Sequence, residues 1–181
     1  MPYFPVFLNF ESKKVLIIGG GTVAFRKANV LKLFCKNITV LSQQFECDFH
    51  GFKCLNKPFE DGDILGYDIV VSATNDNNLN AKVSNLCRNN NILVNVVDDI
   101  DKSDFIFPAL HVGENIVVAV STSGKSPLVA GKIRDNIVEI LPENIDEIIE
   151  KLSEYREELK KTNLSYGEKK ELLAKFYDEN S

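Results

Sequence analysis

The amino-acid sequence predicts an α/β fold, in which a doubly wound parallel sheet is followed by a smaller hairpin-plus-helix module and C-terminal helices. A short apolar strand near the start of the chain leads through three consecutive glycines into a helix. Apolar strands then alternate with helical stretches up to residue 97, and from residue 127 onwards apolar residues recur at helical spacing. We therefore expect three regions, at residues 1–112, 113–141 and 142–181.

The first strand is expected at Val15–Ile18, because a short apolar run ended by glycine suits a central parallel strand. Gly19, Gly21 and Ala24 then fit the Rossmann-like pattern G-x-G-x-x-G/A. The first glycine permits a tight turn, and the second lets a pyrophosphate approach the backbone. Amides at the start of the next helix would face that anion. The predicted cofactor contacts in this segment are Gly19, Gly21, Thr22 and Val23.

The following elements complete the sheet. Helices are expected at Val23–Phe34 and from Leu79 to Cys87, where apolar residues recur at helical spacing. Tyr3–Phe10 is either a short strand or an arm packed on the sheet, and Glu60–Asp63 is a loop or a short helix. The alternation of strands and helices with short connections predicts parallel pairing. The remaining strands are expected at Ile38–Leu41, Lys53–Asn56, Ile69–Ala73 and Ile92–Val97.

The pattern changes after residue 104. Asp104–Ala109 and Asn115–Ser121, joined around His111, predict an antiparallel hairpin. Ser126 followed by proline is typical of a helix start, and Ser165 has capping-box spacing to a glutamate three residues later. The apolar stripes of these helices are interpreted as packing faces. They occupy Leu128–Leu141, Ile145–Leu159 and Leu172–Phe176.

Composition narrows the functional classes. The net charge of −5 argues against a nucleic-acid binder, because no basic surplus is available to neutralise phosphates. No signal peptide is visible and the apolar runs are too short to span a bilayer, so a cytoplasmic protein is expected. The four cysteines form no C-x-x-C pair and only two histidines are present, so no metal site is predicted.

Ligands of open α/β sheets bind beyond the carboxyl ends of the strands. Asp98 directly follows a buried strand and is a candidate general base beside a nicotinamide. A turn-capping role for Asp98 and Asp99 is equally compatible with this position. The further residues expected to contact a cofactor at this edge are Gln43, Gln44, Thr74 and Asn75.

The second predicted strand lacks the acidic residue that usually follows it and holds the ribose hydroxyls. Leu41–Gln44 occupies that place, and no carboxylate occurs before Glu46. Gln43 or backbone amides are left to hold the ribose. Because no arginine is present there for a 2′-phosphate, NAD is favoured over NADP.

A hydroxyl-rich loop lies between the predicted hairpin and the next helix. Backbone amides, hydroxyls and Lys125 at a helix start suit carboxylates, although an ordinary helix cap explains the same residues equally well. The predicted substrate contacts are Ser121, Thr122, Ser123, Gly124, Lys125 and Ser126.

Five segments together resemble one family in their order and spacing. They are Gly19–Lys27, Ser72–Asp76, Asn95–Asp98, Phe105–Pro108 and Ala119–Pro127. From about Pro5 to Leu141 the chain is similar to the precorrin-2 dehydrogenases of siroheme synthesis, including the dehydrogenase part of fused bacterial siroheme synthases.

This resemblance implies oxidation of precorrin-2 to sirohydrochlorin with NAD⁺, in a homodimer built through the module after the nucleotide domain. It assigns catalysis to Asp98 and places the Ser121–Ser126 loop against the tetrapyrrole, with Thr122 and Lys125 as contacts. Some members also insert Fe²⁺ into sirohydrochlorin, and a chelatase without dehydrogenase activity is a further alternative. A rival of another class is a non-catalytic NAD-sensing regulatory module, which would share the glycine turn but would not require the Asn95–Asp98 motif.

Overall fold

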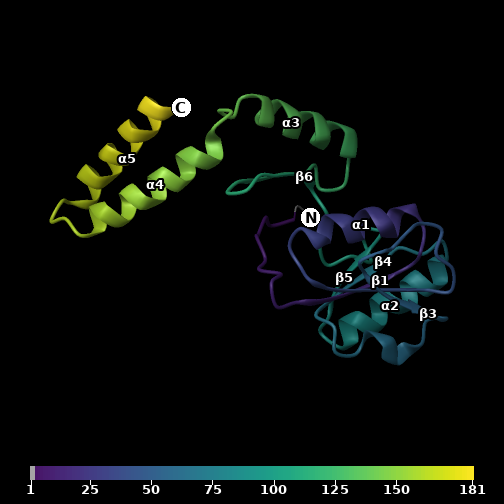
Figure 1. Cartoon of the computed structure of the whole chain (residues 1–181). Coiled ribbons are helices and arrows are strands. Elements are labelled where there is room, and N and C mark those ends of the chain that lie inside the picture. Colours follow the sequence, from purple (N-terminus) through teal and green to yellow (C-terminus); the bar gives the residue numbers. More distant parts are fainter. Residues whose placement is uncertain (1–2) are drawn as a thin grey trace. The chain divides into compact units, whose positions relative to one another are not determined.

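The computed structural model describes residues 3–181 and divides the chain into two compact units, one ending at Ile106 and the other comprising Phe107–Ser181 (Figure 1). The first unit contains a five-stranded sheet in the order β3-β2-β1-β4-β5, and every neighbouring pair is parallel. The predicted parallel α/β sheet is therefore confirmed. Its strands are β1 (Lys14–Ile18), β2 (Asn37–Ser42), β3 (Lys53–Asn56), β4 (Ile69–Ser72) and β5 (Leu93–Val96).

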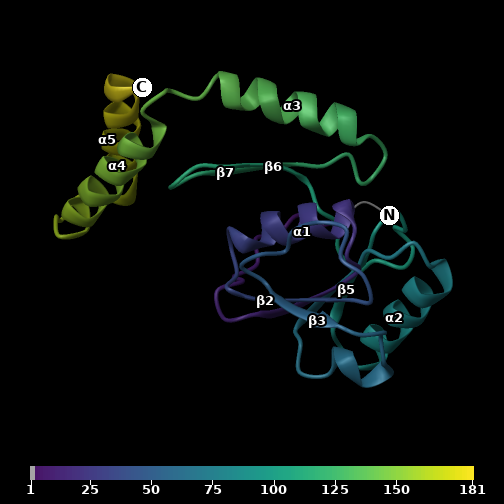
Figure 2. The ribbon, with the colours of Figure 1, turned by 45° about the vertical axis from the view of Figure 1, so that its right-hand side comes forward.

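Helices cover both faces of this sheet. Helix α1 (Thr22–Lys32) lies on one face and α2 (Asn77–Asn89) on the other, with the short 3₁₀ helix η1 (Asp61–Ile64) before β4 (Figures 1 and 2). Strand β1 is almost fully buried from Val15 to Ile18, as a central strand between two helical layers must be. On the α2 face the core comprises Leu16, Ile18, Leu41, Ile64, Val70, Val83, Cys87, Ile92, Val94 and Val96.

The strand order places a topological switch point beside β1. The chain moves from β1 to β2 and β3 on one side, then crosses to β4 and β5 on the other. The loops that follow β1 and β4 therefore diverge at the carboxyl edge of the sheet, where ligands of open α/β sheets bind. The fold thus predicts a ligand site beside the glycine turn.

The second unit contains the antiparallel pair β6 (Ala109–Val112) and β7 (Val117–Val120), followed by α3 (Pro127–Glu139), α4 (Ile145–Lys160) and α5 (Tyr166–Asn180). Arg134 of α3 donates to the Leu110 carbonyl oxygen of β6 at 3.0 Å. The rings of Tyr155 and Phe176 join α4 to α5, with their centroids 5.3 Å apart. The three predicted helices are confirmed, and no helix in the described part of the chain is long and apolar enough to cross a membrane.

Two expectations need correction. The first hairpin strand lies at Ala109–Val112 rather than Asp104–Ala109, because Asp104 is bound to β5: its N–H donates to the Val94 carbonyl at 2.7 Å, and its carboxylate accepts from Val94 N–H at 3.1 Å. His111 therefore lies in β6 rather than in the turn. Residues 3–10 contain no strand, and Phe4 and Phe7 are exposed rather than packed on the sheet.

Candidate functional site

The glycine turn follows β1 and is closed by the loops after β2 and β4. Gly19 has a φ of +127°, and a Cβ there would lie 2.3 Å from the Ala73 carbonyl oxygen. A Cβ on Gly20 would lie only 2.1 Å from the Gln44 carbonyl oxygen. Since non-bonded carbon and oxygen atoms do not approach this closely, both positions require glycine. The turn is therefore held by backbone contacts on two sides.

Helix α1 begins directly after this turn without a side-chain cap. Its N-cap residue is Gly21, which has extended backbone and makes no side-chain capping hydrogen bond, and the first turn of the helix contains no acidic residue. The first amides of the helix, including those of Thr22 and Val23, lack intrahelical acceptors. These donors and the positive end of the helix dipole suit the oxygens of a pyrophosphate.

Glu46 supplies a carboxylate that the sequence analysis did not place at this site. Its N–H donates to the Gly20 carbonyl at 2.9 Å. One oxygen of its carboxylate, Oε2, lies 3.2 Å from the point where a Cβ on Gly21 would be. The loop after β2 therefore returns to the glycine turn and brings an acid there, four residues beyond the end of the strand at Ser42.

Gln43 and Gln44 precede Glu46 and expose their side chains. Their backbone carbonyls have partners within the loop: that of Gln43 accepts from Asn56 Nδ2 at 3.0 Å, and that of Gln44 accepts from Ser42 Oγ at 2.6 Å. The loop is thus fixed by its backbone, while both amide side chains remain available to a ligand.

The loop after β4 is organised around Asn80, a buried residue of α2 that the sequence analysis missed. Its Oδ1 accepts from the hydroxyls of Ser72 and Thr74, both at 2.7 Å, and its Nδ2 donates to the Thr74 carbonyl at 2.9 Å. Asp76 caps α2 by accepting from the amides of Asn78 and Leu79. The Thr74 hydroxyl therefore shapes the loop, and Asn75 is the exposed residue at its tip.

Asp98 and Asp99 follow β5 but play different structural roles. The Asp99 N–H donates to the Val96 carbonyl at 3.2 Å and closes a turn with Asp98 inside it, at a φ of +59°. The Asp99 carboxylate pairs with Lys102, and this hydrogen bond lowers the pKa of Asp99. The Asp98 side chain is exposed and makes no hydrogen bond or ion pair with the described residues. Asp99 is therefore the residue that stabilises the turn. Asp98 has a strained backbone conformation, and such conformations are common at functional sites.

Lys27 of α1 lies within electrostatic range of Asp98. The pKa of Lys27 is lowered to about 8, mainly by burial and also by the positive charge of Arg26, while the negative charge of Asp98 acts in the opposite direction. Lys27 ends the first of the five segments noted in the sequence, but the sequence analysis gave it no role. The structure thus brings an ammonium group, the glycine-turn helix and Asp98 into one neighbourhood.

The loop from Ser121 to Ser126 belongs to the second unit. The Thr122 hydroxyl accepts from the Ser126 N–H at 2.9 Å and donates to its carbonyl at 3.1 Å, while Ser126 Oγ caps α3. Ser121 Oγ accepts from the Ser123 N–H at 3.0 Å. Lys125 is exposed and makes no ion pair with the described residues. The hydroxyls therefore fix the shape of the loop, and Lys125 is its available charge.

The first unit fits a dinucleotide: it has a turn that only glycine allows, uncapped helix amides and a nearby carboxylate. Among residues 3–181, no three His, Cys, Asp or Glu side chains are grouped as metal ligands. These features define a nucleotide-binding domain of the Rossmann-like class. The model of a family described as "Putative NAD(P)-binding" matches residues 6–109, and the chain belongs to this family.

The chain is also similar to longer proteins. It is 34% identical to the siroheme synthase of Vesicomyosocius okutanii over 171 residues, which cover 88% of this chain and 36% of the relative. It is 32% identical to siroheme synthase 2 of Aeromonas hydrophila, over 100% of this chain and 39% of the relative. The chain thus spans little more than a third of these relatives.

A solved structure resembles both units of the chain. It is that of SirC, precorrin-2 dehydrogenase, with a TM-score of 0.77 and 26% sequence identity. The similarity covers 96% of this chain and 88% of that protein.

Proposed function

We propose that this protein is an NAD-dependent dehydrogenase that oxidises precorrin-2 to sirohydrochlorin in siroheme biosynthesis. The proposal is supported by the similarity to SirC along nearly the whole of both chains and by the siroheme synthase relatives. The observation that carries it is Asp98, an exposed carboxylate within electrostatic range of Lys27, in a strained turn at the carboxyl edge of the sheet that also holds the glycine turn. A regulatory NAD-sensing module does not need such a group.

The reaction removes a hydride and a proton from the substrate. Bound NAD⁺ supplies the hydride acceptor. Asp98 accepts the proton, for which an exposed carboxylate is chemically suited. The amides at the start of α1 hold the cofactor pyrophosphate. The proposed cofactor contacts are Gly19, Gly21, Thr22, Val23, Gln43, Gln44, Thr74 and Asn75.

Glu46 extends this set and gives the preference for NAD. A carboxylate beside the glycine turn accepts hydrogen bonds from the ribose hydroxyls and repels the 2′-phosphate of NADP. Glu46 is thus proposed as a ribose partner in addition to Gln43 or the backbone amides, the two alternatives that the sequence left open.

The second unit is proposed to contact substrate carboxylates through the loop from Ser121 to Ser126, with Lys125 supplying the charge. It is also proposed to form a homodimer, which the exposed apolar side chains of Leu128 and Ile133 on α3 support. A cytoplasmic location is supported by four cysteines that are all free.

The test is to incubate the protein with precorrin-2 and NAD⁺ without oxygen, and to follow the absorbance of sirohydrochlorin and NADH. Product that depends on both protein and NAD⁺ is expected. If thermal unfolding shows that the protein is folded and it binds NAD⁺ without turnover, the dehydrogenase proposal is refuted. The NAD-sensing regulatory module would then be the better interpretation. A parallel sample containing sirohydrochlorin and Fe²⁺ but no NAD⁺ measures metal insertion separately.

A further inference from the structure

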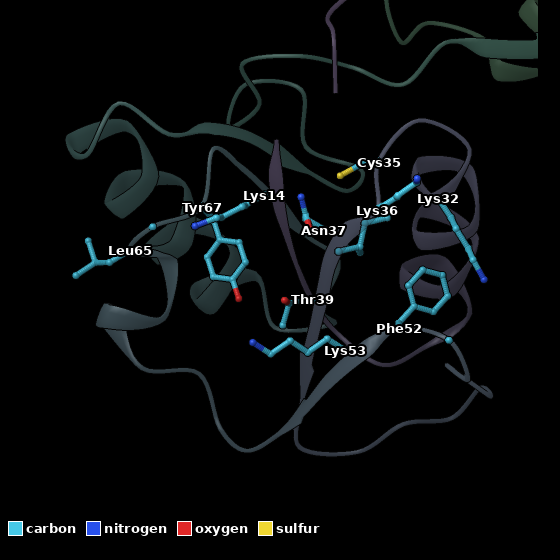
Figure 3. Close-up of a pocket in the computed structure, with 13 residues that line it drawn as sticks. Lys14, Lys32, Cys35, Lys36, Asn37, Thr39, Phe52, Lys53, Leu65 and Tyr67 are labelled. Carbon is cyan, nitrogen blue, oxygen red and sulfur yellow. The ribbon is translucent and has the colours of Figure 1, made fainter. Parts of the chain in front are cut away.

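A cavity lies at the end of the strands opposite to the glycine turn. It has a volume of about 730 Å³ and is formed at the amino ends of β1, β2 and β3 with the loop before β4 (Figure 3). The glycine turn and Asp98 lie at the carboxyl ends of the strands, so this cavity is separate from the cofactor site. None of the residues discussed above as cofactor or substrate contacts lines it.

The lining of the cavity is basic, although the chain as a whole carries a net charge of −5. No acidic residue lines it within the described part of the chain, and four lysines do: Lys14, Lys32, Lys36 and Lys53. The neighbouring Asp68 carboxylate is bound to Lys13 Nζ at 3.2 Å and to the backbone N–H of Lys14 at 2.8 Å. It is therefore engaged beside the cavity rather than inside it.

Two of the lysines are less suited to bind a ligand in the cavity. Lys32 lies at the end of α1, where a cation complements the helix dipole, and its Nζ is 5.2 Å from the centroid of the Phe52 ring. Lys36 points away from the centre of the cavity (Figure 3). The candidate ligand-binding groups of the cavity are therefore Lys14, Lys53 and the polar groups around them.

Thr39 is the decisive polar group. It lies in the middle of β2 between Leu16 of β1 and Lys53 of β3, and only 5% of it is exposed. Its hydroxyl makes no hydrogen bond with the described residues and is not one of their fully buried unpaired groups, so it faces the open cavity and can donate to a ligand there. Figure 3 shows the hydroxyls of Thr39 and Tyr67 and the ammonium of Lys53 pointing into the same part of the cavity. A ligand with acceptor oxygens would satisfy all three groups.

We propose that this cavity binds a small organic or inorganic anion carrying at least two negative charges on phosphate or carboxylate groups. The ammonium groups of Lys53 and Lys14 neutralise the ligand, and the hydroxyls of Thr39 and Tyr67 donate to its oxygens. The open volume accommodates a ligand larger than a single phosphate. This inference does not depend on the proposed dehydrogenase activity.

Isothermal titration calorimetry with pyrophosphate and with citrate tests the proposal and separates phosphate from carboxylate ligands. Each titration is made with and without saturating NAD⁺, because pyrophosphate also suits the amides at the start of α1. Binding that persists in the presence of NAD⁺ and weakens with added salt is expected. Loss of all binding in the presence of NAD⁺ would overturn the proposal, because the probe would then occupy the glycine turn.

Variants locate the bound probe. Lys53→Gln and Thr39→Val should each raise the dissociation constant about fivefold or more, since each removes one hydrogen bond to the anion. Thr39→Ser retains the hydroxyl and should bind like the wild type. Lys170→Gln on α5 changes the net charge equally and should have no effect. Equal weakening by Lys170→Gln, or undisturbed binding by Thr39→Val and Lys53→Gln, would refute the site. Thr39→Val should unfold no more easily than the wild type without ligand, because the Thr39 hydroxyl makes no hydrogen bond with the described residues.

Discussion

Asp98→Asn separates the chemistry of this residue from its place in the fold. Asparagine has nearly the same shape and tolerates positive φ as well as aspartate does, so the turn between Val96 and Asp99 should survive. Because the Asp98 side chain is exposed, the variant loses no buried contact. The unfolding free energy should therefore change by less than about 0.5 kcal/mol. Turnover should fall by about 10²–10⁴, the usual contribution of a positioned general base.

Asp98→Gly tests the strain in the same turn. Glycine adopts a φ near +59° without a steric penalty, so this variant should be more stable than the wild type by about 1 kcal/mol. In a unit of this size such a gain raises the melting temperature by about 4–8 °C. Stability should rise while turnover falls, which simple loss of folding cannot produce.

The assay measures precorrin-2 turnover, NAD⁺ affinity and melting temperature for each variant. Asp99→Asn is the matched control: it breaks the pair with Lys102 and should lower stability slightly while turnover is retained. Near-normal turnover by Asp98→Asn would remove Asp98 as the base. An unchanged melting temperature in Asp98→Gly would contradict the strain argument.

Three further predictions concern the cofactor edge. Glu46→Gln should weaken NAD⁺ about tenfold and reduce the discrimination against NADP⁺, measured as dissociation constants for both; equal effects on the two cofactors would remove Glu46 as the selective group. Gly20→Ala should lower both melting temperature and NAD⁺ affinity, because its Cβ displaces the loop at Gln44; wild-type values would show that the loop yields freely. Lys27 has a pKa of about 8 when folded against 10.5 ordinarily, so the unfolded chain binds more protons between these values and the unfolding free energy should rise with pH there. Below about pH 8 Lys27 is protonated in both the folded and the unfolded state, and the folded state then bears the full cost of burying the ammonium group. Urea unfolding should show this rise in the wild type but not in Lys27→Met, and identical pH profiles would contradict it.

Local sequence patterns predicted most of the strands and helices. The apolar run before Gly19, the glycine spacing and the capping residue Ser126 each specify structure through neighbouring residues, and each was found where expected. The first hairpin strand was placed wrongly because Asp104 uses its backbone and carboxylate to bind β5. This long-range contact leaves no mark in the local pattern.

The residues missed at the candidate site depend on the paths of loops. Glu46 is not at the end of β2, and only the hydrogen bond to Gly20 reveals that its loop returns to the glycine turn. Asn80 is one of many asparagines between Asn75 and Asn91, and its burial alone distinguishes it. In the sequence Thr39 is an ordinary β-branched strand residue, and only the structure shows that its hydroxyl lines a cavity.

Because α1 has no side-chain cap, the stability of this protein, and with it the protein's lifetime in the cell, should depend on the concentration of the bound nucleotide. A side-chain cap is worth about 1 kcal/mol relative to alanine but only a few tenths of a kcal/mol relative to the glycine present here, and the open amides are left to the cofactor. Binding at a concentration one hundred times the dissociation constant would stabilise the folded state by about 2.7 kcal/mol. A shift of that size changes the unfolded fraction exposed to proteases by about two orders of magnitude. The cellular level of this protein should therefore follow the nucleotide pool, so that the chain is removed fastest when the ligand is scarce.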